Sequence, residues 1–409
     1  MRNVEAGVQF GARRALDAVV GPEALNAVGG FDSVDEWLLV VGAGEGNVAV
    51  GVPVLGEDNV IEARGEGIDP GYDAMAICHR ECTAREEVDL HVDDEERVGV
   101  AEIHSSKRTI FCKDRLIVRV QVVVKIIECP RDAWQWLPKV IMPEVKAEYL
   151  RALITAGFTH IDTGSFVSNG FVPQMADSEL VLEYLDAAAE IEIIGLVLNA
   201  KGAELAVESG RVTTLAFPYS ISPQFLERNQ RQTPEEALDQ LEQVGELAYK
   251  GGQDVVAYVA MAFGNPFGDM WDIDEVVSAV DLLVDLGVAQ VSLSDTAGVA
   301  SAELVRDVVR LVLDVHEGLE IGVHLHARPE DAAAKVKAAY EAGCRRFDAS
   351  IGGLGVCSFS QDLMVRNLPT EVLLATLKDL GAELPEIEPL ERLIAMSSEI
   401  EKRYGTAIQ

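Results

Sequence analysis

The sequence predicts an α/β fold: a (β/α)8 barrel of the TIM-barrel class, with an N-terminal extension of different character. Three observations lead to this prediction. From about residue 124 onward, short β-branched runs alternate with amphipathic segments, and there are eight such runs. The runs are apolar enough to be buried on both faces, which is typical of parallel strands covered by helices. An open, doubly wound sheet is the structural alternative.

Each expected strand is a short run rich in Val, Ile, Leu or Phe. Because all strands of such a barrel run in the same direction, the residues that follow the runs gather at one end of the barrel. In chain order the runs are 124–129 (VKIIEC), 158–162 (FTHID), 193–199 (IIGLVLN), 213–218 (TTLAFP), 255–263 (VVAYVAMAF), 289–295 (AQVSLSD), 320–326 (EIGVHLH) and 345–350 (RRFDAS).

Helix-like stretches lie between the runs, with apolar residues near positions i, i+3, i+4 and i+7 and a glycine at or near the end. Examples are 142–157, 233–252 and 273–287. The second begins with 233–236 (TPEE), which predicts a Thr N-cap, a Pro at the first helical position and two acids that complement the helix dipole. These segments supply the helices that the barrel requires.

Residues 1–120 differ from the rest, because they are Gly-rich and acidic and show no sustained helical period after about the first twenty positions. We therefore expect two domains: 1–120, an acidic Gly-rich segment of unknown role, and 121–409, the barrel. An extension that is not needed for function is a further alternative for the first domain.

Two motifs in residues 1–120 suggest binding sites only superficially. The run 40–51 (VVGAGEGNVAVG) lacks the third glycine of a dinucleotide-binding turn, and a strand rather than a helix is expected after it. A zinc site can be drawn from Cys78, His79, Cys82 and His91, but the Cys-x3-Cys pair has no matching second pair. A solvated acidic module is the favoured interpretation.

The chain is strongly acidic: 34 Lys and Arg stand against 68 Asp and Glu, a formal net charge of −34. This balance repels phosphate backbones and anionic lipids, so we expect neither a nucleic-acid nor a membrane partner. No apolar run approaches the roughly 20 residues of a bilayer span, and a cytoplasmic location is expected. Six irregularly spaced cysteines argue against a disulfide framework.

Candidate metal ligands lie just after the first run and at the end of the seventh run. Arg131 and Asp132 come directly after the first, a pair that alone would suggest only a surface ion pair. The seventh run ends in His324 and His326, and period-2 alternation directs both imidazoles to the same face. Two imidazoles and one carboxylate suit a divalent ion with open positions, typically Mg²⁺ or Mn²⁺, with Zn²⁺ and Fe²⁺ as alternatives.

Two more acids and a thiol end other runs. Asp162 ends the second and Asp295 the sixth, and either carboxylate has the alternative role of a helix N-cap. A glycine-rich loop after the eighth run, 352–357, carries Cys357. Buried cysteines are usually inert, but a thiol over a metal site can donate or accept a proton.

Several motifs occur together: 130–132 (PRD) with Gln135, 164–168 (GSFVS) with 172–175 (VPQM), 292–296 (SLSDT), 324–326 (HLH), and 353–355 (GLG) with Cys357. From about Val124 to the C-terminus the chain thereby resembles the 3-hydroxy-3-methylglutaryl-CoA lyases. These belong to the pyruvate carboxyltransferase-like TIM-barrel superfamily, which also holds isopropylmalate and homocitrate synthases. Nothing in residues 1–120 matches the family.

The resemblance implies a metal-assisted retro-Claisen cleavage of an acyl-CoA substrate, 3-hydroxy-3-methylglutaryl-CoA, to acetyl-CoA and acetoacetate. It implies that Arg131 stabilises the enolate oxygen and that Cys357 protonates the enolate carbon. The metal ligands it implies are Asp132, His324, His326 and Asn367. The implied catalytic residues are Arg131, Cys357, Asp162, Asp295 and His324, and the implied substrate-binding residues are Arg131, Gln135, Tyr258 and Thr296.

Some positions depart from the family pattern. Val356 and Ser358 flank Cys357 where Gly and Pro are typical, and a β-branched residue stiffens a loop. Two alternatives stay open: a related aldolase, acyl-CoA lyase or synthase with another substrate, and a catalytically impaired barrel used for binding. A homodimer is a possible assembly, and leucine degradation with ketone-body formation is the setting that analogy suggests.

Overall fold

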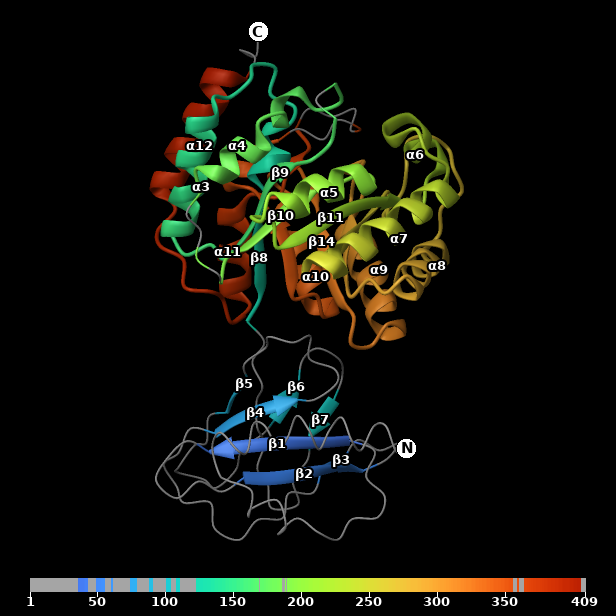
Figure 1. Cartoon of the computed structure of the whole chain (residues 1–409). Coiled ribbons are helices and arrows are strands. Elements are labelled where there is room, and N and C mark those ends of the chain that lie inside the picture. Colours follow the sequence, from blue (N-terminus) through green and yellow to red (C-terminus); the bar gives the residue numbers. More distant parts are fainter. Residues whose placement is uncertain are drawn as a thin grey trace. The chain divides into compact units, whose positions relative to one another are not determined.

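The computed structural model describes residues 123–409 except 169, 186–187, 189, 356–358, 360–363 and 406–409. In residues 1–122 it describes the backbone of seven strands. The chain divides into two compact units, Met1–Val122 and Val123–Gln409. Figure 1 shows the strands and helices of both units.

The first unit contains a five-stranded antiparallel sheet in the order β3-β2-β1-β4-β5, and a separate β6–β7 pair. The run 40–51 leads into a strand that pairs with β1, so no helix follows it as a dinucleotide-binding turn requires. The side chains of the drawn zinc set lie outside the described residues. The strands are β1 Glu36–Gly42, β2 Ala49–Leu55, β3 Val60–Ile61, β4 Ala74–Cys78, β5 Val88–Leu90, β6 Ala101–Ile103 and β7 Arg108–Ile110.

The second unit is a closed parallel barrel, in the order β10-β11-β12-β13-β14-β16-β8-β9. Each of the eight expected runs forms one barrel strand, so the predicted (β/α)8 fold is confirmed and the open sheet is excluded. The barrel strands are β8 Lys125–Glu128, β9 His160–Ser165, β10 Glu192–Leu196, β11 Thr214–Ser220, β12 Asp254–Ala260, β13 Gln290–Ser294, β14 Glu320–His324 and β16 Arg346–Ala349.

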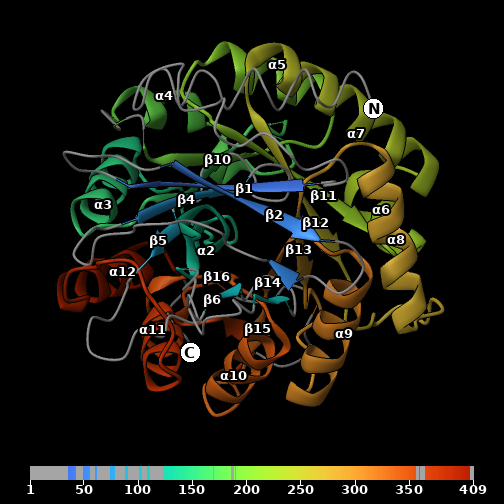
Figure 2. The same ribbon diagram turned by 90° about the horizontal axis from the view of Figure 1, so that it is seen from below.

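The helices of this unit surround the strands (Figure 2). They are α2 Pro130–Trp134, α3 Pro143–Thr155, α4 Ser178–Glu183, α5 Ala200–Glu208, α6 Pro223–Gln230, α7 Pro234–Gly251, α8 Ile273–Asp285, α9 Ala302–Val315, α10 Ala332–Ala342, α11 Thr370–Asp379 and α12 Glu391–Tyr404, with short 3-10 turns η2 Pro173–Met175 and η3 Ile351–Gly353. The predicted start of α7 is confirmed: Thr233 and Glu236 form a capping box, with Pro234 in the first turn. None of the described helices combines the length and apolarity that crossing a membrane requires.

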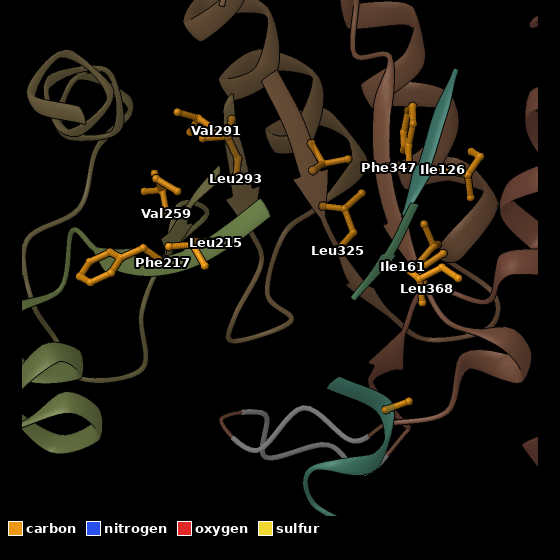
Figure 3. Packing of buried hydrophobic residues seen from close by; sticks show 14 of the residues in the cluster. Ile126, Ile161, Leu215, Phe217, Val259, Val291, Leu293, Leu325, Phe347 and Leu368 are labelled. Carbon is orange, nitrogen blue, oxygen red and sulfur yellow. The ribbon is translucent and has the colours of Figure 1, made fainter. Parts of the chain in front are cut away.

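Alternation along the strands creates two apolar layers. Residues such as Ile126, Leu215 and Phe347 belong to the large core that includes residues of the surrounding helices (Figure 3). Their neighbours Ile127 and Ala216 belong to a smaller separate cluster, which lies in the barrel interior. Because the interior is filled with side chains, the chemistry is confined to the end where the strands stop.

A small ribbon completes that end of the barrel. Strand β14 stops at His324, and His326 lies on a separate short strand, β15 His326–Ala327. This strand pairs antiparallel with β17 Arg366–Asn367, which places His326 directly opposite Asn367. His326 and Asn367, which are 41 positions apart in the sequence, are thereby brought together at the mouth of the barrel.

Candidate active site

Asp132, His324 and His326 converge at the C-terminal end of the barrel strands. One ligand atom from each lies within 4.8 Å of the others. Asp132 comes from α2, which starts directly after β8 with Pro130 in its first turn. The Nε2 atom of His324 is 3.9 Å from Oδ2 of Asp132, and the two imidazole centroids are 5.3 Å apart. The set predicted from the sequence therefore forms one cluster.

Each imidazole has its Nδ1 atom engaged, which leaves Nε2 for the cluster. Nδ1 of His324 is 3.2 Å from a carboxylate oxygen of Asp348, and Nδ1 of His326 is 2.9 Å from the backbone carbonyl oxygen of Asp295. Partners of this kind fix the tautomer and the orientation of a metal-binding histidine. The geometry suits a metal ligand at both Nε2 atoms.

Asn367 adds a buried oxygen that has no hydrogen-bond partner among the described residues. Its amide nitrogen donates to Asp132 at 2.8 Å and to the carbonyl oxygen of Leu354 at 2.9 Å, while no group in the described part of the chain bonds to Oδ1. An orphaned buried carbonyl oxygen beside two imidazoles and a carboxylate is what a divalent ion would satisfy. Gly355, at φ +110°, makes room, because a Cβ there would lie 2.4 Å from this amide nitrogen.

Arg131 lies next to Asp132 and is locked in place by carboxylates. It donates to both oxygens of Asp162, from Nη2 at 2.5 Å and from Nε at 3.1 Å, and its Nη1 is 3.2 Å from Asp132. Gln135 accepts from Arg131 at 3.3 Å and donates to Asp132 at 2.7 Å. The guanidinium is buried, and its pKa stays above the usual value because the two carboxylates outweigh the effect of burial.

The charges around the cluster set the protonation of its members. Burial works to raise the pKa of Asp132, but Arg131 and the two histidines outweigh it and the pKa lies below the usual value. Burial works to lower the pKa of His324, but Asp348 and Asp132 raise it above its usual value. The pKa of His326 is lowered by burial and by the nearby His324. Asp132 is therefore ionised and able to bind a cation.

The predicted residues Asp295 and Thr296 bond to backbone groups of neighbouring segments. The Asp295 carboxylate accepts from the backbone N–H groups of Val299 and Ala300 and forms a 2.9 Å ion pair with Lys335. These contacts hold the backbone that follows β13 in place. The alternative role of Asp295 as a helix N-cap is not observed, because the N-cap of α9 is Ser301. The hydroxyl of Thr296 accepts from the backbone N–H of Met261 at 2.9 Å.

Of the two remaining predicted residues, the structure describes Tyr258 but not Cys357. Tyr258 is buried, and its ring meets that of His324 edge-on with centroids 6.1 Å apart. Cys357, with its neighbours Val356 and Ser358, lies outside the described residues. A second thiol, Cys129, groups with His324 and Asp348, but burial raises its pKa well above the usual value, so it stays protonated and is a poor ligand.

Asp348, the partner of His324, was not among the residues predicted for the site. It lies on β16 directly beside His324 of β14, and it is buried. The signal was present as an inward-facing acid at period 2 from Arg346 in the last apolar run. A buried acid in a parallel strand requires a partner, and that reasoning alone would have marked the position.

A closed barrel with a metal-ligand set at the C-terminal ends of its strands is the arrangement of a metal-dependent barrel enzyme. Residues 124–395 match the model of a family described as HMGL-like. The cytoplasmic 3-hydroxy-3-methylglutaryl-CoA lyase of Danio rerio is 33% identical over 266 residues, 65% of this chain and 79% of that protein. The (R)-citramalyl-CoA lyase of Chloroflexus aurantiacus is 29% identical, over 70% of this chain and 92% of that protein.

A solved structure agrees with these relatives. The HMG-CoA lyase from Acinetobacter baumannii, in complex with coenzyme A and 3-methylmalate, is 31% identical with a TM-score of 0.63, over 70% of this chain and 93% of that one. The chain belongs to the HMGL-like family and is a carbon–carbon lyase. The resemblance found in the sequence is thereby confirmed, and lyases of this family depend on a divalent metal.

Proposed function

We propose that this lyase cleaves 3-hydroxy-3-methylglutaryl-CoA to acetyl-CoA and acetoacetate, with Mg²⁺ or Mn²⁺ held by Asp132, His324, His326 and Asn367. The observation that carries the proposal is the convergence of two imidazoles, an ionised carboxylate and a buried amide oxygen with no partner among the described residues, beside a buried arginine. When bound, the ion supplies Lewis-acid stabilisation that makes the substrate's 3-hydroxyl more acidic.

Side chains of this chain remove the hydroxyl proton and stabilise the enolate. Asp162 takes the proton from the 3-hydroxyl, because it is an acid of the site outside the ligand set and burial raises its pKa despite Arg131. The bond between the second and third carbon atoms breaks, the hydroxyl carbon becomes the ketone of acetoacetate, and the electron pair passes to the thioester as an enolate. Arg131 stabilises the enolate oxygen, since its guanidinium is already oriented by Asp162.

Protonation of the enolate carbon completes the reaction. Cys357 is the proposed acid, on the strength of its family motif with Gly353 and Gly355. Gln135 and Tyr258 would line the substrate position, since Gln135 contacts Arg131 and Tyr258 contacts His324. His324 contributes as a ligand, Asp295 contributes by orienting His326 through its backbone carbonyl, and Thr296 contributes by holding the backbone at Met261.

A second substrate is favoured by one relative, which is named as a citramalyl-CoA lyase. The purified protein should therefore be incubated with each acyl-CoA in turn, with Mg²⁺ or Mn²⁺ and with or without EDTA, while acetyl-CoA is measured. Metal-dependent release from 3-hydroxy-3-methylglutaryl-CoA supports the proposal. Release from citramalyl-CoA alone would move the assignment to that substrate, and release from neither would favour an impaired barrel used for binding.

We also propose that residues 121–409 hold the whole lyase function and that residues 1–120 are not needed for it. The barrel closes with strands that all come from the second unit, and the family match begins at residue 124. A chain that starts at residue 121 should keep the turnover of the full chain, and loss of turnover in a folded variant would contradict this. A homodimer acting in cytoplasmic leucine degradation stays part of the proposal by analogy.

A further inference from the structure

Asp348 and His324 form a buried pair between neighbouring strands. The β14–β16 ladder places the two residues directly opposite each other, and Oδ2 of Asp348 lies 3.2 Å from Nδ1 of His324. Asp348 is 1% exposed, and the same oxygen accepts a hydrogen bond of 3.4 Å from the hydroxyl of Ser292. The carboxylate is therefore shielded from water and held at one ring nitrogen of His324.

Arg346 lies two residues before Asp348 on the same inward face of β16. Its Nη1 is 3.6 Å from Oδ1 of Asp348, and its Nε is 3.2 Å from Glu320 at the start of β14. Arg346 is also 1% exposed, and it crosses β14 at Gly322, where a Cβ would lie 2.9 Å from its Cγ. The glycine thus provides the space through which the arginine reaches the acid.

These contacts form one series of charges inside the barrel. Lys125 of β8 pairs with Glu320, Glu320 with Arg346, Arg346 with Asp348, and Asp348 with His324. A lone carboxylate in this interior would be expensive to bury, and the arginine offsets that cost. The series ends at a nitrogen atom of one member of the metal-ligand set, so the interior of the barrel is connected to the site at its mouth.

We propose that Asp348 is a positioning residue for the metal site: it holds the imidazole of His324 so that Nε2 faces Asp132 and His326, while Arg346 holds Asp348. The inference rests on the proposed function, in which His324 is a ligand. An Nδ1–H group that donates to Asp348 leaves the lone pair of His324 on Nε2, where the ion would sit. Without this partner the ring is free to change tautomer or rotate.

The test measures Mn²⁺ binding, by electron paramagnetic resonance of the free ion, for the full chain and for Asp348→Ala. We expect the variant to bind Mn²⁺ about 10- to 100-fold more weakly. Glu128→Gln is the matched control, because Glu128 is an equally buried acid near the barrel mouth that bonds to Ile351 N–H and the Thr370 hydroxyl. This control should keep the affinity of the unaltered protein.

Two further measurements test the inference if Asp348→Ala does not fold. The double variant Arg346→Met with Asp348→Ala removes both buried charges, and it should lose Mn²⁺ affinity to the same extent as Asp348→Ala. In the unaltered protein, ¹⁵N NMR of the imidazoles, recorded at a pH at which His324 is neutral and assigned with His324→Gln, should show His324 as the Nδ1–H tautomer. The Nε2–H tautomer, or full affinity in either variant, would overturn the inference alone. Absence of Mn²⁺ binding in the unaltered protein would overturn the proposed function as well.

Discussion

Arg131 of α2 and Asp162 of β9 form a two-pronged ion pair, with contacts of 2.5 and 3.1 Å. Both side chains are buried, so water does not compete for these hydrogen bonds. The pair holds the guanidinium plane in one orientation and leaves Nη1 toward Asp132. A cation that is fixed before substrate arrives stabilises developing negative charge without the cost of reorganisation.

Replacement of Arg131 by Lys should therefore lower kcat by about 100-fold or more. Lysine keeps the charge but has no planar fork with which to engage both oxygens of Asp162. Steady-state kinetics with 3-hydroxy-3-methylglutaryl-CoA would measure the change, and Mn²⁺ affinity should stay within a few-fold. A lysine variant with near-normal kcat would refute the role of a fixed guanidinium.

Replacement of Asn367 by Ala should weaken Mn²⁺ binding by about 10-fold or more, because it removes an oxygen ligand and the hydrogen bond to Asp132. Isothermal titration with Mn²⁺ would measure the affinity. Asn265→Ala is the control variant and should leave the affinity unchanged. The side chain of Asn265 makes its hydrogen bonds to Phe267 and Asp269, in the loop before α8. Equal affinities for the two variants would remove Asn367 from the ligand set.

Replacement of Cys357 by Ala should abolish most turnover and leave metal binding intact. The physical reason is that the enolate carbon needs a proton, and the variant has no acid at this position. Turnover should be compared with that of the control variant Cys344→Ser. Cys344 is a buried thiol two residues before the start of β16, and its pKa is raised to about 12. If Cys357→Ala retained normal turnover, another group would have to supply the proton.

Glu128 should make the stability of the barrel depend on pH. Burial raises its pKa from 4.5 to about 8, so the folded chain keeps this proton at pH values where the unfolded chain releases it. The stabilising contribution is complete below pH 4.5 and is lost as the pH rises from 4.5 to about 8, a change of roughly 3 to 5 kcal/mol.

Denaturant unfolding at pH 5 and pH 8 would measure this effect. Glu128→Gln carries no titratable group at this position, so its free energy of unfolding should fall less between the two pH values than that of the unaltered chain. Identical pH dependence in both proteins would show that Glu128 titrates normally.

The elements of the fold could be predicted well because their signals are local. Alternating apolar runs and amphipathic segments reflect burial and hydrogen bonding within a few residues, and every expected run became a barrel strand. Asp132, His324 and His326 were also predictable, since residues that end parallel strands must meet at one end of the barrel.

Asp348 and Asp295 show where this reasoning stopped. Asp348 ends up opposite His324 only because β16 pairs with β14 in one register, a contact between segments 24 positions apart. Asp295 is engaged by Lys335, which lies 40 positions further along the chain. The sequence does not state which acid will meet which base when the strands close into a barrel.

The order of strands and helices and the end of the barrel at which the site lies could be predicted from the sequence, because periodicity and strand direction are local properties. The family was indicated by the resemblance of short motifs such as 130–132 and 324–326. The tertiary structure decided which side chains support the ligands. Only the closed barrel fixes the distances between Asp348, Arg346 and His324, and only those distances show that a charged series in the interior reaches the site. Such contacts depend on long-range packing, which no short stretch of sequence encodes.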